Sequence, residues 1–102
     1  MKQKIISILF LSGACLRALS ADAEAGFQSI FNGKDLAGWD GNPKFWSVKD
    51  GAIVGQTTAA NPTKGNTFLI WTNGTTADFE LRASYKITPN NDRNFANSGF
   101  QY

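Results

Sequence analysis

The chain has 102 residues, of which 42% are apolar, 18% charged and 13% aromatic. This composition is typical of a globular domain and excludes a disordered polymer, a collagen and a coiled coil. Ten glycines accompany the aromatic residues, a combination that favours short strands and turns over helices.

The formal net charge of +2 includes three bases near the amino terminus, Lys2, Lys4 and Arg17. After Ala23, seven bases face seven acids, so the rest of the chain is neutral and has no basic stripe. A nucleic-acid-binding protein normally presents such a stripe. Nucleic acid is therefore not an expected partner.

Residues 1–23 are predicted to be a signal peptide. Lys2 and Lys4 supply the positive start, residues 5–11 the apolar stretch, and Ala21-Asp22-Ala23 the small residues before the cleavage point. The apolar stretch is much shorter than the roughly 20 residues that span a bilayer. We therefore expect export to the periplasm or the cell exterior, with residues 24–102 as the mature domain.

Cys15 leaves two interpretations open. The segment 11–15 (LSGAC) resembles a bacterial lipobox, in which the cysteine is acylated and anchors the protein to the membrane. Ordinary cleavage would instead discard Cys15 with the signal peptide. In both cases no other Cys and no His remains, so disulfides, zinc sites and a Cys–His nucleophile cannot be built from this chain alone.

Short apolar runs separated by turn residues predict strands over 27–31, 45–48, 52–54, 67–72 and 78–87, and a last strand beginning near Ser98. The dipeptides Asn32-Gly33, Asp50-Gly51 and Asn73-Gly74 predict tight turns. Residues 78–87 form the clearest strand, because apolar and polar residues alternate and so define one dry and one polar face. No helical periodicity follows the signal segment, so the fold class is predicted to be all-β.

The chain stops at Tyr102, inside the predicted last strand. About 80 mature residues would bury only a modest core for an antiparallel sandwich. We therefore expect residues 24–102 to be the amino-terminal part of a longer domain.

Five local patterns occur in the order typical of one family. They are the segments 26–39 (GFQSIFNGKDLAGW), 45–55 (FWSVKDGAIVG), 67–71 (TFLIW), 78–82 (DFELR) and 97–102 (NSGFQY). Together they resemble the start of the 3-keto-disaccharide hydrolase domain, also known as DUF1080, over essentially all of residues 26–102.

The resemblance implies a concanavalin A-like jelly roll, in which two antiparallel sheets form a concave face that holds sugar. It also implies a secreted bacterial hydrolase acting on 3-keto-disaccharides or other 3-keto-glycosides. Family members carry further strands and most of their acid, base and His candidates in a later stretch. The fragment 24–102, an incomplete sandwich, is therefore expected to be inactive by itself.

The chemistry of such a substrate can be stated without the family. A C3 ketone acidifies the C2 hydrogen, so that a base can abstract it and the C1 substituent can leave by elimination; water then adds back. This route needs a base near C2, donors to the enolate oxygen and an acid for the leaving group. Two carboxylates flanking C1, as in ordinary glycosidases, are the rival mechanism.

The polar face of strand 78–87 carries the first candidates. Glu80 is the candidate base and Lys86 an oxyanion partner, although both could simply form ion pairs on a solvated sheet face. Asn97 and Gln101 share one face of the predicted last strand and are expected to bind sugar hydroxyls, with Phe100 and Tyr102 buried on the other. The alternative for Asn97 is a turn that enters an edge strand.

Trp71, like Trp39 and Trp46, is a candidate for stacking on a sugar ring, although packing in the core is the commoner role. No cofactor is predicted. A divalent metal stays an open alternative because oxygen ligands suffice, but no loop matches a known calcium pattern, and Asp35, Asp40 and Asp50 are explained as turn residues.

The function predicted from the sequence is that of an exported enzyme that cleaves 3-keto-glycosides. A non-catalytic jelly-roll module that binds glycans is the alternative, because one fold can serve either purpose. The expected partner is a carbohydrate, and the membrane is a partner only through a lipid anchor on Cys15.

Overall fold

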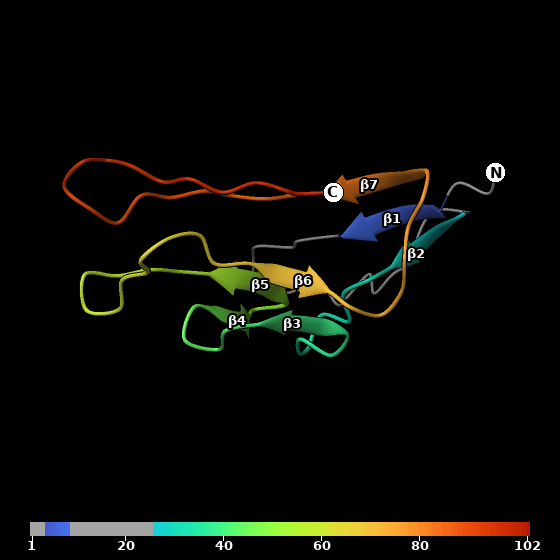
Figure 1. Ribbon diagram of the computed structural model, residues 1–102, viewed down its shortest axis with the longest axis horizontal. Coiled ribbons are helices and arrows are strands. Elements are labelled where there is room, and N and C mark those ends of the chain that lie inside the picture. Colours follow the sequence, from blue (N-terminus) through green and yellow to red (C-terminus); the bar gives the residue numbers. More distant parts are fainter. Residues whose placement is uncertain (1–3, 9–25) are drawn as a thin grey trace.

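The computed structural model describes residues 4–8 and 26–102. Seven strands are found in these residues (Figure 1): β1 (Lys4–Ile8), β2 (Phe27–Ser29), β3 (Trp39–Gly41), β4 (Trp46–Lys49), β5 (Ala52–Gly55), β6 (Leu69–Trp71) and β7 (Phe79–Ala83). The described residues contain no helix. The predicted all-β class is confirmed for this part of the chain.

The strands form three small sheets. One has the order β2-β1-β7, and the other two are the pairs β3-β6 and β4-β5. The two pairs are antiparallel, as expected. In the first sheet, however, β1 runs parallel to both neighbours, which differs from the purely antiparallel sheets that the resemblance implied.

The β4-β5 hairpin follows directly from its turn residues. Asp50 and Gly51 have positive φ angles of 52° and 74°, the conformation that a two-residue type I′ turn requires. Lys49 consequently lies opposite Ala52, and Trp46 opposite Gly55. The turn predicted at Asp50-Gly51 is confirmed.

Other predicted turns have a different role. The chain does turn at Asn32-Gly33, where the Asn32 Oδ1 atom accepts hydrogen bonds from the Lys34 and Asp35 amides at 2.8 and 2.9 Å. No hairpin forms there, because β2 pairs with β1. The turn at Asn32-Gly33 is predicted correctly from its own residues. The partner of β2 is set by residues that lie far away in the sequence.

Strand β7 is shorter than predicted but has the expected alternation. Its five residues alternate between half-buried and exposed, beginning with half-buried Phe79. Residues 84–102 continue as a long arm without strand assignment, which doubles back so that the end of the chain returns beside β7 (Figure 1).

The last strand predicted near Ser98 is therefore wrong, and so is the predicted burial of Phe100 and Tyr102. These side chains are 49% and 101% exposed. Both rings do contact aromatic neighbours edge to face, Tyr102 with Phe79 and Phe100 with Tyr85. No second sheet of the described residues covers these rings. The rings therefore contact one another but remain exposed to solvent.

The most buried apolar side chain of the described part is Phe31, at 8% exposure. It follows β2 and precedes the turn at Asn32-Gly33. The indole Nε1 of Trp39 donates to the Ile30 carbonyl at 2.7 Å, and this bond fastens β3 to the same segment. The packed centre therefore lies where β2 leads into the turn before β3.

Candidate functional site

The polar face of β7 carries Glu80, the predicted base. Its Oε1 atom accepts a hydrogen bond from Arg82 Nε at 2.9 Å, and both side chains are about half exposed. The Arg82 guanidinium carbon also lies 4.2 Å from the centre of the Phe27 ring on β2, a cation–π contact. Arg82 therefore orients Glu80 while leaving its carboxylate open to solvent.

Three of the other predicted site residues lie on the long arm. Lys86, Asn97 and Gln101 are all exposed and outside any strand. The contacts of Tyr85 with Phe100 and of Phe79 with Tyr102 tie the two limbs of the arm together. Gln101, between Phe100 and Tyr102, is thereby brought to the limb that continues from β7.

The tryptophans divide into two kinds. Trp39 and Trp46 are held by indole hydrogen bonds, to the Ile30 carbonyl and to Thr67 Oγ1 at 3.1 Å, which indicates a structural role. Trp71 ends β6 opposite Trp39 and is half-buried. A Cβ atom at Gly74 would lie 3.0 Å from its ring, so Gly74 covers one part of the Trp71 ring.

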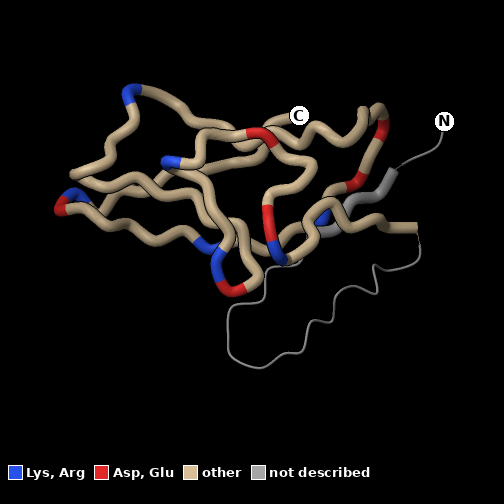
Figure 2. The backbone as a smooth tube through the Cα atoms, turned by 90° about the horizontal axis from the view of Figure 1, so that it is seen from below, with Lys and Arg blue, Asp and Glu red and all other residues tan. Residues whose placement is uncertain are grey.

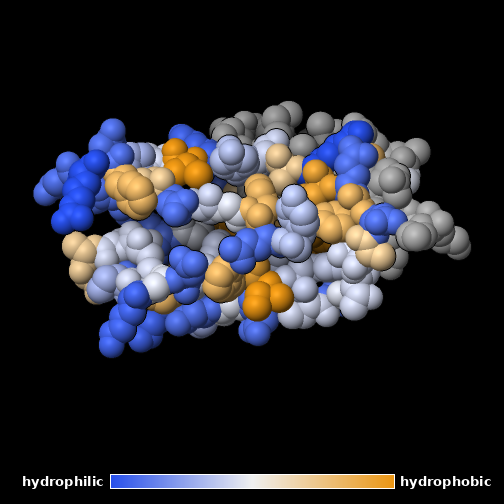
Figure 3. All heavy atoms as spheres, turned by 45° about the horizontal axis from the view of Figure 1, so that its top comes forward, coloured by the Kyte–Doolittle hydropathy of each residue, from blue (hydrophilic) through white to orange (hydrophobic). Residues whose placement is uncertain are grey.

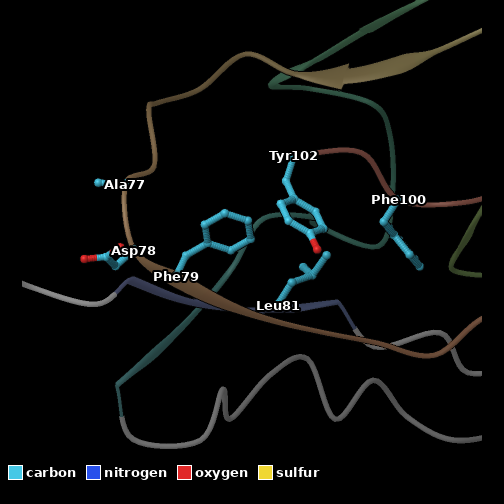
Figure 4. A pocket seen from close by; sticks show the side chains of 6 residues that line it. All are labelled: Ala77, Asp78, Phe79, Leu81, Phe100 and Tyr102. Atoms are coloured by element: carbon cyan, nitrogen blue, oxygen red, sulfur yellow. The ribbon is translucent and has the colours of Figure 1, made fainter.

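A hollow with three aromatic residues in its lining lies beside β7, with a volume of about 660 Å³ (Figure 4). Its walls are Ala77, Asp78, Phe79, Leu81, Phe100 and Tyr102. In Figure 4 the Phe79 and Tyr102 rings lie next to each other, and Asp78 points away from them. None of the five predicted site residues lines this hollow.

Sequence reasoning missed this hollow because it assigned Phe100 and Tyr102 to a buried core. The signal that could have found it was the apolar face of β7, with Phe79 and Leu81. Phe100 and Tyr102 on the returning limb are the aromatic residues that complete the hollow. Figure 3 shows hydrophobic residues on the surface in separate patches between hydrophilic ones. An exposed aromatic surface of this kind is typical of a contact site.

A second hollow, of about 440 Å³, is polar. Its lining consists mostly of hydroxyl, amide and carboxylate side chains: Thr57, Thr58, Ala59, Pro62, Thr63, Asn90, Asn91 and Asp92. Asn90 Nδ2 donates to the Thr57 carbonyl at 2.8 Å, so the tip of the long arm is fastened to the loop after β5. This hollow was also not predicted.

The three aspartates predicted as turn residues differ in their location and hydrogen bonds. Asp35 Oδ1 accepts hydrogen bonds from Asn32 Nδ2 at 2.6 Å and from the Ala37 amide at 3.0 Å. These two bonds, with the charge of Lys34, hold the pKa of Asp35 below its ordinary value. Asp50 occupies the β4-β5 turn, whereas Asp40 lies within β3, so the turn assignment of Asp40 is wrong.

Charge is distributed evenly over the described chain. Figure 2 shows basic and acidic residues interspersed, largely at turns and loops. Within residues 4–8 and 26–102, no group of three or more His, Cys, Asp or Glu side chains is placed to hold a metal ion. No helix in the same residues is long and apolar enough to cross a membrane.

These features define a small all-β domain with a solvent-open carboxylate and an aromatic hollow on the same strand. Over residues 26–102 the chain matches the family of 3-keto-alpha-glucoside-1,2-lyase-like domains, and it belongs to that family. The family is enzymatic, and its name implies a sugar substrate. No curated protein and no solved structure matches the chain.

Proposed function

We propose that this protein cleaves the C1–O bond of 3-keto-glycosides, 3-keto-disaccharides among them. The observation that carries the proposal is the family match over residues 26–102. A 1,2-lyase breaks the C1–O bond by an elimination that forms a double bond between C1 and C2. The exposed Glu80 carboxylate, oriented by Arg82, supports it with a base that substrate can reach.

The proposed reaction has two steps. Glu80 removes the C2 proton, the electron pair passes into an enolate on the C3 ketone, and the C1–O bond then breaks as a C1=C2 double bond forms. The leaving oxygen takes a proton and departs as an alcohol. Water then adds across the double bond, its oxygen to C1 and a proton to C2, so that the net reaction is hydrolysis.

The residues of the long arm are proposed to bind the sugar. Asn97 and Gln101 supply amide donors and acceptors for hydroxyl groups, and Lys86 stabilises the enolate oxygen. Trp71 offers the uncovered part of its ring for stacking. A concanavalin A-like jelly roll is the architecture proposed to bring these groups around one substrate.

We also infer that the protein is exported. The inference rests on the basic start, the apolar stretch and the small residues at 21–23. Most of residues 1–23, including Cys15 and the cleavage point, lie outside the described residues. Sequencing the amino terminus of the secreted product distinguishes cleavage after Ala23 from an acylated Cys15, and a cytoplasmic product that retains Met1 would contradict export.

The mechanism is tested by isotopic labelling at C2. A 3-keto-disaccharide deuterated at C2 should be cleaved more slowly than the unlabelled one by the full-length gene product, because the C2 bond breaks in the first step. Ordinary double displacement by two carboxylates leaves that bond intact. Equal rates at saturating and at limiting substrate would contradict the elimination step.

The second candidate function is glycan binding without catalysis. The hollow at Phe79, Phe100 and Tyr102 favours it, because aromatic rings stack on sugar faces and this hollow contains a single carboxylate. Saturable binding of ordinary disaccharides, without turnover of their 3-keto derivatives by the full-length gene product, would support this function over the enzymatic one.

A further inference from the structure

The first sheet contains a strand from the predicted signal peptide. β1 lies between β2 and β7, with Ile5 opposite Phe27 on one side and Glu80 on the other. Its register extends over three residues of β2 and five residues of β7. β1 is thus the central strand, although it belongs to a segment predicted to be removed by cleavage after Ala23.

The pairing also shows what removal of β1 would leave. Neighbouring strands lie about 4.8 Å apart, so β2 and β7 on either side of β1 are separated by roughly 9–10 Å. Without β1 both strands would present unpaired N–H and C=O groups to this space, and such groups are costly unless another strand or water satisfies them. The space between β2 and β7 is wide enough for one strand, and the unpaired N–H and C=O groups of β2 and β7 could bond to it.

One contact joins the two walls of this space directly. Arg82 lies on β7, in register with Ser7, while Phe27 lies on β2, in register with Ile5. The Arg82 guanidinium nevertheless reaches within 4.2 Å of the Phe27 ring centre. It therefore crosses the position of β1. One side-chain contact therefore joins the two walls across β1.

We propose that β2 and β7 form a strand-acceptor site for a short apolar segment running parallel to both, and that residues 4–8 of the leader occupy it in the uncleaved chain. Addition of a strand to available sheet groups is an established way of binding extended peptides. The leader is then a placeholder strand, and its removal opens the site. This inference concerns the sheet and is independent of the proposed catalytic function.

The test uses residues 1–102, made by cell-free synthesis so that the leader is retained. Ile6→Pro is placed at the centre of β1, where proline removes the amide hydrogen and cannot remain in a central strand. Leu19→Pro is the matched control, since it introduces the same residue into the leader outside β1. Hydrogen exchange is followed at the amides of β2 and β7, with the β4-β5 hairpin as internal reference.

We expect Ile6→Pro to speed exchange in β2 and β7 roughly tenfold or more, while Leu19→Pro leaves it unchanged and the hairpin is unaffected in both. A synthetic peptide with the sequence of residues 3–10 should slow exchange in the Ile6→Pro chain again. The same peptide carrying Ile6→Pro should have no effect. Neither peptide should bind the Leu19→Pro chain, in which the site is already filled.

Three results would each overturn the proposal. The first is equal exchange in β2 and β7 for the parent and Ile6→Pro chains. The second is an equal rise for both proline variants, or loss of protection in the hairpin to the same extent, since either would show that the site is not local. The third is failure of the unmodified peptide to slow exchange in the Ile6→Pro chain.

Discussion

Gly55 lies directly opposite Trp46 in the β4-β5 ladder, and the Trp46 ring occupies the place where a Cβ of residue 55 would be. An added Cβ would stand 2.5 Å from Trp46 Cζ3. The indole is also fixed at its other end by the bond from Nε1 to Thr67 Oγ1. The missing side chain at position 55 therefore determines how Trp46 packs across the hairpin.

The first prediction follows from this contact. Gly55→Ala should displace the Trp46 ring and lower the free energy of unfolding by about 1–3 kcal/mol, as overpacking commonly does. Thermal unfolding measures the loss, and a shift in tryptophan fluorescence reports the displaced ring. Gly65→Ala is the control, because nothing lies within 4 Å of a Cβ at Gly65; an equal loss in both variants would contradict the explanation.

The second prediction concerns pH. Asn32 first, then the Ala37 amide and the charge of Lys34, lower the pKa of Asp35 in the folded chain. Because the folded pKa is depressed, the stabilisation is fully present above the unfolded pKa and is lost as the pH falls through the folded pKa. Asn32→Ala should raise the pKa of Asp35 toward 3.8, measured by carboxyl-carbon NMR titration, while Asn66→Ala should leave it unchanged.

The third prediction separates catalysis from stability at Glu80. Glu80→Gln should reduce kcat for a 3-keto-disaccharide by about 10²–10⁴-fold, the usual contribution of a general base. The half-exposed pair with Arg82 should contribute only about 0.2–1 kcal/mol to stability, so Tm should change little. Both quantities are measured on the full-length gene product, with Asp40→Asn, at an exposed carboxylate of β3, as the control. Unchanged kcat in Glu80→Gln would remove Glu80 from the mechanism.

The fourth prediction concerns Gln101. Gln101→Ala should lower kcat/KM by about 5- to 150-fold, equivalent to losing a hydrogen bond of about 1–3 kcal/mol to substrate, with Tm nearly unchanged. Gln56→Ala, an exposed glutamine just after β5, is the matched control. If both variants turn over substrate at the parent rate, the sugar site lies elsewhere.

The fifth prediction concerns the aromatic hollow. Since Phe100 is 49% exposed, Phe100→Ala should cost about 1 kcal/mol for its edge-to-face contact with Tyr85, well below the loss expected of a core residue. It should weaken binding of disaccharides more than Phe95→Ala, which alters another exposed ring outside the hollow. Equal binding by both variants, measured calorimetrically, would exclude the hollow as a sugar site.

The sequence predicted local structure better than pairing. Asp50-Gly51 specified its hairpin because the turn requires positive φ angles at two adjacent residues, and the alternation along β7 identified its half-buried face. Ser98–Tyr102 looked like a strand because polar and aromatic residues alternate there, but a strand needs a partner in register, which the pattern alone does not contain. The position of β1 between β2 and β7 was invisible for the same reason.

The candidate site was predictable only in part. Glu80 was found on the exposed face of its strand, as the alternation indicated, but its bond to Arg82 and the reach of Arg82 to Phe27 depend on the spacing of three strands. Both hollows escaped prediction because each is formed by segments distant in sequence. The loop 57–63 and the arm tip 90–92 are joined by the hydrogen bond from Asn90 to the Thr57 carbonyl. No local sequence pattern predicts this contact.

In the sequence, the β4-β5 hairpin lies between the two strands of the β3-β6 pair, and this arrangement affects the order of folding. β3 and β6 pair Trp39 with Trp71, about 30 residues apart, and the β4-β5 hairpin lies between them. A tight hairpin closes in about 1–10 μs, whereas closing a long loop costs more chain entropy. Early closure of the hairpin shortens the chain that remains to be ordered, so the Trp39–Trp71 pair should form after Trp46 has docked on Gly55.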